Sequence, residues 1–216
     1  MGLVMEYNGI ELCNYPICDT DIWVDVVLAK IVDKLFEKYE KVIVSDVVEK
    51  EILYFESGDY AIVADTYCKY KNDGKVVVIC HTDIDINDRK LLERQLKDCS
   101  SEFQYGLADK PHEEHKGEIV SAIYACHFEI PFLKSNDGTF REGHMGRIAF
   151  PDLIVKNRRQ TLIDLLKNEN DRISANQLIE DNRAFMNEGK RLYENREVTK
   201  DQVMNLLEKM RGNCCR

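Results

Sequence analysis

The chain has 216 residues, of which 44% are hydrophobic and 32% are charged, and its formal net charge is −9. This hydrophobic content is sufficient for a buried core and argues against wholesale disorder. The negative charge argues against nucleic-acid binding through a broad basic face. It leaves room for an acidic site that meets phosphates through metal ions.

The sequence gives no indication of secretion or of membrane insertion. The first residues carry no basic region ahead of an apolar run, and no apolar stretch approaches the roughly 20 residues that cross a bilayer. The eight cysteines include no CxxC pair, and several lie inside apolar runs. This usage is typical of reduced thiols in the cytosol. We therefore expect a cytoplasmic protein without membrane association.

The first half of the chain alternates short apolar runs with helical periodicity. An apolar piece that starts at Tyr15 predicts a first strand, and Asp19 falls where this strand should end. Apolar residues at helical spacing then predict one helix from Ile22 to Tyr39. Further strands are expected over Lys41–Ser45 and Lys75–Cys80, and further helices over Val47–Phe55, Asp59–Tyr70 and Asp85–Cys99.

The stretch from Gly117 to Phe140 predicts a helix, a turn and a buried strand. Glu118 opens the helix, whose apolar positions recur at helical spacing. The strand around Leu133 runs out at Ser135 and Asp137. In open α/β sheets, ligands bind beyond the carboxyl ends of the strands, which is where Asp137 should lie.

The C-terminal third is predicted to be mainly helical. Arg141–Arg147 should be a loop, and Ile148–Val155 either an edge strand or the start of a helix. Helices are then expected over Val155–Asn168, Ser174–Asn195 and Thr199–Arg211. Strands that alternate with helices predict an α/β fold with three α/β/α layers around a short, mostly parallel sheet of four or five strands. We assign residues 1–150 to this domain and residues 151–216 to a helical extension.

Four carboxylates stand out by their positions on the predicted elements: Asp19, Glu51, Glu118 and Asp137. Asp19 and Asp137 end the first and last predicted strands. Glu51 lies on the helix after the second strand, and Glu118 starts the helix before the last strand. Carboxylates that crowd together raise one another's pKa unless a cation compensates. The usual compensation is a hard divalent ion such as Mg²⁺ or Mn²⁺, and paired ions of this kind act in phosphodiester cleavage.

The same residues resemble the PIN-domain ribonuclease family. The run Gly117–Phe140 is similar to the C-terminal half of such a domain, Asp19-Thr20 matches the pair that follows its first strand, and Val47–Glu51 matches its Val-Val-x-x-Glu helix. The similarity covers roughly residues 15–145.

This resemblance implies a metal-dependent endoribonuclease that hydrolyses RNA phosphodiesters with metal-activated water, often as the toxin of a bacterial toxin–antitoxin pair. It implies Mg²⁺ or Mn²⁺ as cofactor, and RNA, an antitoxin protein and a second copy of the chain as partners. The catalytic and metal-binding residues would be Asp19, Glu51, Glu118 and Asp137, with Thr20, Asp21 and Ser135 in support.

Other interpretations remain open from the sequence. The chain could be a PIN-like interaction module with little cleavage, and Glu49 competes with Glu51 for its place in the site. Asp19-Thr20-Asp21 also fits the start of a haloacid-dehalogenase phosphatase motif, but Trp23 stands where that motif has Thr or Val. His112 and His115 have i,i+3 spacing rather than the i,i+4 spacing of HExxH, which favours a polar loop over a zinc site.

Overall fold

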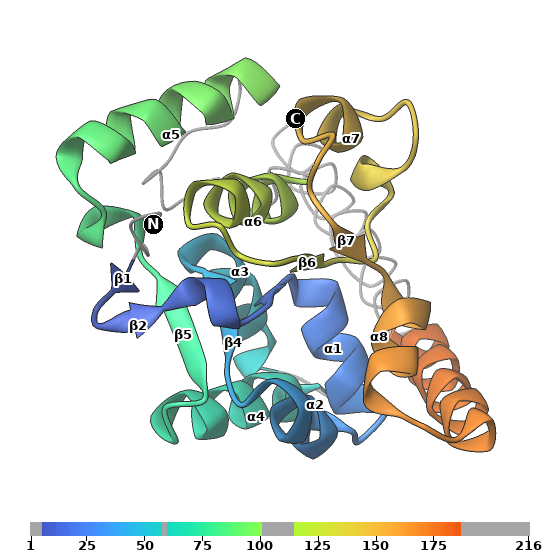
Figure 1. The fold of residues 1–216 in the computed structure, drawn as a ribbon. Coiled ribbons are helices and arrows are strands. Elements are labelled where there is room, and N and C mark those ends of the chain that lie inside the picture. The colour runs from blue at the N-terminus through green and yellow to red at the C-terminus, as the bar shows by residue number, and fades with distance from the viewer. Residues whose placement is uncertain (1–5, 58–59, 101–114, 187–216) are drawn as a thin grey trace, which may run out of the picture. The chain divides into compact units, whose positions relative to one another are not determined.

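The computed structural model describes residues 6–57, 60–100 and 115–186 (Figure 1). The chain divides into two compact units, of which the first ends at Ala175 and the second begins at Asn176. None of the helices in the described ranges is both long and apolar enough to cross a membrane.

The first unit is built on a parallel sheet of five strands in the order β5-β4-β3-β6-β7. The strands are β3 (Ile17–Cys18), β4 (Val42–Ser45), β5 (Val76–Ile79), β6 (Leu133–Lys134) and β7 (Val155–Lys156). Strand order reverses at β3, because the chain first moves outward to β5 and then returns to β6 on the other side. The carboxyl ends of β3 and β6 therefore lie beside each other, at the position where open α/β sheets bind ligands.

Helices cover both faces of this sheet (Figure 1). One face carries α5 (Ile86–Cys99) and α6 (Lys116–His127), and the other carries α1 (Thr20–Leu28), α2 (Val32–Tyr39) and α4 (Ala61–Asn72). Helix α3 (Asp46–Leu53) packs against both α1 and α6, so it reaches the helices of both layers. The three-layer α/β/α fold expected from the sequence is thus confirmed.

Each face of the sheet has its own apolar core. Between the sheet and α6, Ile17 and Ile43 pack with Ile119 and Ile123 in one buried cluster. On the opposite face, aromatic rings of α1, α2 and α4 pack together around Trp23, whose indole N–H donates to the Val63 carbonyl oxygen at 3.2 Å. The burial of apolar side chains on both faces explains why the strands are short continuous apolar runs.

The single helix predicted over Ile22–Tyr39 is wrong. The structure has two helices, because α1 ends in a tight turn with Lys30 in the left-handed region at φ 58°. The backbone N–H of Ile31 donates to the Val26 carbonyl, and that of Lys30 donates to the Val27 carbonyl. This pair of hydrogen bonds is a Schellman motif, which usually has glycine in place of Lys30. Without a glycine or proline, the apolar pattern runs through the turn unbroken.

The segment after residue 140 also differs from its prediction. Part of the expected loop and the residues after it form α7 (Met145–Ala149), and the chain then enters β7 as the fifth strand of the sheet. Helix α8 (Arg158–Leu165) begins after β7, with a capping box formed by Asn157 and Gln160. Both β7 and α8 belong to the first compact unit, although the sequence analysis placed them in the C-terminal extension.

In the second unit, residues 176–186 are helical. The expected end of this helix at Asn195 and the predicted helix Thr199–Arg211 lie outside the described residues. At the N-terminal end of the described chain, β1 (Glu6–Tyr7) and β2 (Ile10–Glu11) form an antiparallel pair that the sequence analysis did not predict.

Candidate metal centre

Asp19 lies at the carboxyl end of β3 and caps helix α1. Its Oδ1 accepts a hydrogen bond from the Thr20 backbone N–H at 2.6 Å, and its Oδ2 accepts one from the Ser135 hydroxyl at 2.9 Å. The residue is 1% exposed. Two donors from two elements therefore fix the orientation of this buried carboxylate.

Glu51 reaches the same place from helix α3. Its Oε2 accepts a hydrogen bond from the hydroxyl of Thr20, the residue after Asp19. The backbone of α6 approaches it so closely that a Cβ at Gly117 would lie 2.7 Å from Glu51 Oε1. An alanine at this position would therefore have to displace the Glu51 carboxylate.

The choice between Glu49 and Glu51, which the sequence left open, is decided by these contacts. Glu49 Oε1 accepts hydrogen bonds from the Tyr67 hydroxyl at 2.8 Å and from Lys71 Nζ at 2.6 Å. Glu49 is therefore engaged with helix α4, and Glu51 lies beside Asp19.

Glu118 and Asp137 complete the group of acids. Glu118 lies in the first turn of α6, and Asp137 follows β6, where its Oδ1 accepts a hydrogen bond from the Thr139 backbone N–H at 2.6 Å. The Ser135 hydroxyl oxygen accepts a hydrogen bond from the Asp137 backbone N–H at 3.2 Å. Ser135 therefore contacts Asp137 as well as Asp19 and links the ends of the two central strands.

Burial and the charges of neighbouring acids raise the pKa of two of the four carboxylates. Burial raises the pKa of Asp19 well above its ordinary value, and the charges of Glu118, Asp21 and Glu51 raise it further. Burial likewise raises the pKa of Glu118 to about 7, with added repulsion from Asp137 and Glu51. The four predicted acids therefore lie close enough for their charges to act on Asp19 or Glu118, with Thr20, Asp21 and Ser135 next to Asp19.

Asp137 behaves differently from the other acids. Burial alone would raise its pKa, but hydrogen bonds from Thr139 and the neighbouring His115 lower it overall. His115 Nδ1 lies 3.2 Å from Asp137 Oδ1. Asp137 is therefore the acid of this site that stays ionised to lower pH than an ordinary aspartate.

His115 is the residue of this site that the sequence analysis missed. One potential ligand atom from each of His115, Glu118 and Asp137 lies within 4.8 Å of the other two. Its spacing from His112 is not that of a zinc helix, and from the sequence alone this spacing favours a polar loop. The available signal was its spacing from Glu118, three residues later, at the start of a helix. His112 lies outside the described residues.

The donor groups fit a divalent cation. Carboxylate oxygens are the ligands that Mg²⁺ and Mn²⁺ prefer, and an ion would relieve the repulsion that raises the pKa of Asp19 and Glu118. The acids come from four segments that are far apart in sequence, so their convergence depends on the fold rather than on local charge clustering.

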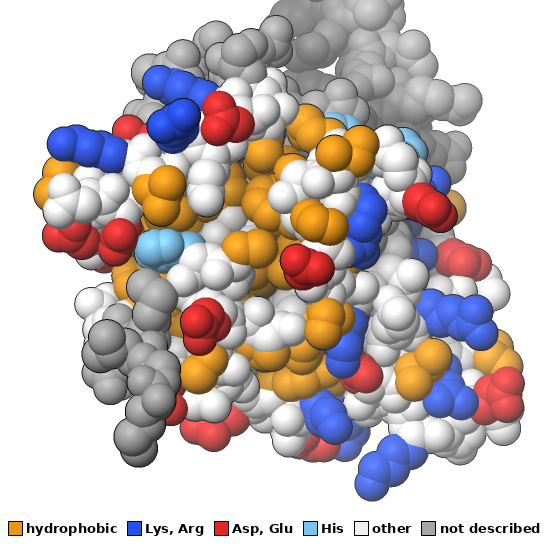
Figure 2. Space-filling model, turned by 45° about the horizontal axis from the view of Figure 1, so that its top comes forward, with side chains coloured by type: hydrophobic (Ala, Val, Ile, Leu, Met, Phe, Trp, Pro, Cys, Tyr) orange, Lys and Arg blue, Asp and Glu red, His pale blue; other side chains and the backbone are white. Residues whose placement is uncertain are grey.

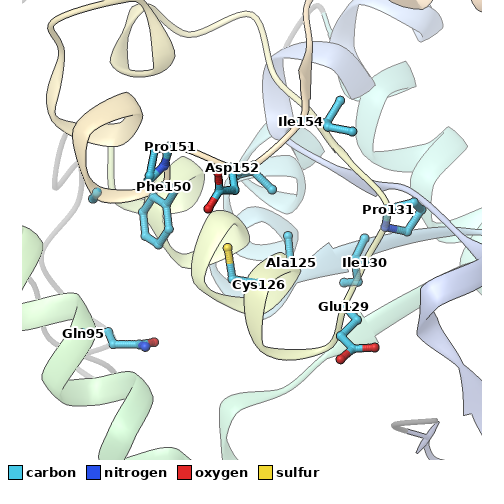
Figure 3. A pocket seen from close by; sticks show the side chains of 12 residues that line it. Gln95, Ala125, Cys126, Glu129, Ile130, Pro131, Phe150, Pro151, Asp152 and Ile154 are labelled. Carbon is cyan, nitrogen blue, oxygen red and sulfur yellow. The ribbon is translucent and has the colours of Figure 1, made fainter. Parts of the chain in front are cut away.

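A separate apolar groove lies at the amino ends of β6 and β7, away from the acids. It encloses about 520 Å³ between the C-terminal end of α6, residues 129–131 and residues 149–154. Figure 2 shows hydrophobic side chains gathered on the face that carries α5, α6 and α7. Within the groove, Cys126, Phe150 and Asp152 project between the ribbons (Figure 3). None of the four acids lines it.

Comparison with known proteins adds no assignment. The chain matches no protein family, no curated protein and no solved structure.

Proposed function

We propose that this protein is a Mg²⁺- or Mn²⁺-dependent endoribonuclease of the PIN type, with its catalytic centre at Asp19, Glu51, Glu118 and Asp137. The observation that carries the proposal is the convergence of these four carboxylates beyond the ends of β3 and β6, where burial and mutual repulsion raise the pKa of Asp19 and Glu118. The order and positions of the same residues support the resemblance to PIN domains.

The protein residues have distinct tasks in this proposal. Asp19 presents a carboxylate whose direction is fixed by Thr20 and Ser135, and Thr20 also holds Glu51. Ser135 fixes the position of the Asp137 backbone through its hydroxyl oxygen. Divalent ions, when bound, supply charge neutralisation at the phosphate and lower the pKa of water. The chain itself supplies the preorganised ligands.

The contacts of Asp19 favour a ligand role over the nucleophile role of a haloacid-dehalogenase phosphatase. Both of its oxygens accept hydrogen bonds, and the residue is 1% exposed. A nucleophilic carboxylate must present an oxygen to the substrate phosphorus. Each oxygen that accepts one hydrogen bond keeps a further lone pair, with which it can bind an ion, so a ligand role fits these contacts.

The test is RNA cleavage with substitutions that keep the shape of the acids. End-labelled single-stranded RNA of mixed sequence is incubated with the parent protein, Asp19→Asn or Asp137→Asn, in Mn²⁺, in Mg²⁺ and in EDTA. We expect cleavage only with a divalent ion. Each substitution should reduce the rate by at least about 100-fold, since even the outer partners of metal ligands are worth 10–100-fold.

Glu49→Gln is the matched control, because Glu49 lies on the same helix as Glu51 and contacts Tyr67 and Lys71 instead. It should cut at the parent rate, and circular dichroism should show all variants folded. If Asp19→Asn and Asp137→Asn cut as well as the parent, these residues are not the catalytic ones. If the parent does not cut RNA under any of these conditions, the interaction-module interpretation is favoured instead.

A further inference from the structure

We propose that His115 is a metal ligand, and that with Glu118 and Asp137 it forms a mixed nitrogen–oxygen position that takes a first-row transition-metal dication in preference to Mg²⁺. The inference deepens the proposed function, on which it rests in one respect: both place a divalent ion on Glu118 and Asp137. The two carboxylates alone would not favour a transition metal over Mg²⁺ at this position, and the inference is that His115 does.

The geometry of three side chains carries this inference. His115 directly precedes α6, Glu118 lies in its first turn, and Asp137 follows β6. One potential ligand atom of each lies within 4.8 Å of the other two, which is close enough for a single ion to contact all three. His115 Nδ1 already lies 3.2 Å from Asp137 Oδ1, so the imidazole is directed toward the acids.

The chemistry of the donors decides which ion fits. Mg²⁺ is a hard ion that prefers oxygen ligands and keeps several waters. Imidazole nitrogen instead binds first-row transition metals, whose affinity for such ligands rises from Mn²⁺ to Cu²⁺ and is lower again for Zn²⁺. An imidazole among two carboxylates therefore adds affinity for transition metals and little for Mg²⁺. Mn²⁺ is the most demanding probe, because it is the weakest binder of the series.

The experiment measures metal binding without RNA. Isothermal titration of the full chain with MnCl₂ and with MgCl₂ is carried out for the parent, His115→Ala and His144→Ala. We expect His115→Ala to weaken Mn²⁺ binding by roughly tenfold or more and to change Mg²⁺ binding by less than about twofold. His144 is exposed and caps α7 without a side-chain hydrogen bond, so His144→Ala should bind both ions as the parent does.

A spectroscopic measurement separates a ligand from a neighbour. Electron spin-echo spectroscopy of bound Mn²⁺ should show coupling to a directly bound ¹⁴N nucleus in the parent and in His144→Ala, and no such coupling in His115→Ala. Absence of the coupling from the parent would overturn the proposal and leave His115 as a positioning partner of Asp137. Equal loss of Mn²⁺ and Mg²⁺ affinity in His115→Ala would overturn it as well.

The outcomes are distinguishable from those of the cleavage assay. A parent protein that shows the ¹⁴N coupling but does not cut RNA would keep this inference and contradict the proposed function. A protein that cuts RNA equally well in Mg²⁺ and Mn²⁺, with His115→Ala unaffected in rate and in metal binding, would keep the proposed function and contradict this inference.

Discussion

Single residues of the candidate centre are held by hydrogen bonds that leave little freedom to the carboxylates. Asp19 receives one hydrogen bond from its own helix start and one from Ser135, and Thr20 donates to Glu51. These contacts hold negative groups close together in a buried place. The metal-free protein must therefore tolerate repulsion that a bound cation would remove.

The burial of Glu118, with added repulsion from Asp137 and Glu51, predicts an unusual pH dependence of stability. The pKa of Glu118 is raised to about 7 in the folded protein from an ordinary value of 4.5. Between these values, the folded protein holds a proton that the unfolded chain has lost. The free energy of unfolding should therefore fall as the pH rises through this range. In EDTA, Glu118→Gln should melt higher than the parent at pH 8 and at about the same temperature at pH 4.5.

The measurement is a series of thermal melts in EDTA at several pH values. Each kcal/mol of relieved repulsion should raise the melting temperature by about 2–4 °C for a chain of this size. Glu142 is exposed, and Glu142→Gln should melt as the parent does at every pH. A parent protein whose stability does not fall between pH 5 and pH 7 would contradict the raised pKa of Glu118.

The glycine beside Glu51 gives a second prediction at this scale. Because a Cβ at Gly117 would lie 2.7 Å from Glu51 Oε1, Gly117→Ala should displace the carboxylate and weaken Mn²⁺ binding by about tenfold. Gly138→Ala is the control, since its Cβ would meet no atom closer than 3.8 Å. Titration calorimetry measures both. Unchanged Mn²⁺ affinity in Gly117→Ala would show that the position of Glu51 does not matter for binding.

The helices and strands that the sequence predicts best are those whose sequence pattern matches the surroundings in which they pack. Strands β4 and β5 are β-branched apolar runs, and the Ser45 side chain caps α3. The sequence does not predict the turn at Lys30, because glycine usually occupies this position of the motif and a lysine stands there instead. The sequence offered an edge strand over Ile148–Val155 only as an alternative to the start of a helix. Strand β7 begins at the end of that range, where its two residues form a strand by pairing with β6.

Helix α8 is tied to the sheet through Asp164, which gives a prediction about stability. Lys134 of β6 has a fully buried side chain whose Nζ lies 3.5 Å from Asp164 Oδ2, and Lys156 Nζ lies 2.8 Å from the same oxygen. Asp164→Asn would leave the buried Lys134 without its counter-ion. We expect the free energy of unfolding to fall by about 3 kcal/mol at pH 7, measured by urea denaturation.

The pH dependence of this loss follows from the pKa of Asp164. Burial would raise that pKa, but hydrogen bonds from Lys156 and Tyr39 and the charge of Lys134 lower it overall. The stabilisation is therefore fully present above the unfolded value and is lost as the pH falls through the folded value. The difference between parent and Asp164→Asn should be constant above about pH 5 and shrink below about pH 4. Asp98→Asn, on an exposed part of α5, should differ little from the parent at any pH.

For the whole molecule, the sequence predicts those site residues whose position follows directly from the ends of the predicted parallel strands. Asp19 and Asp137 could be found because each follows an apolar run, and parallel strands bring such ends to one edge. His115 could not be assigned in this way, because its role depends on the distance to Asp137 in space. The choice of Glu51 over Glu49 likewise required the packing of α3 against α1 and α4.

The central claim is that four carboxylates from distant segments form one cation site. Crystals soaked in MnCl₂, with anomalous diffraction collected at the manganese edge, test it most directly. We expect an anomalous peak within coordination distance of Glu118 and Asp137, on the side of Asp19 and Glu51, that disappears in Asp137→Asn. A map with no peak among these side chains at saturating Mn²⁺, or with the same peak in Asp137→Asn, would contradict the claim.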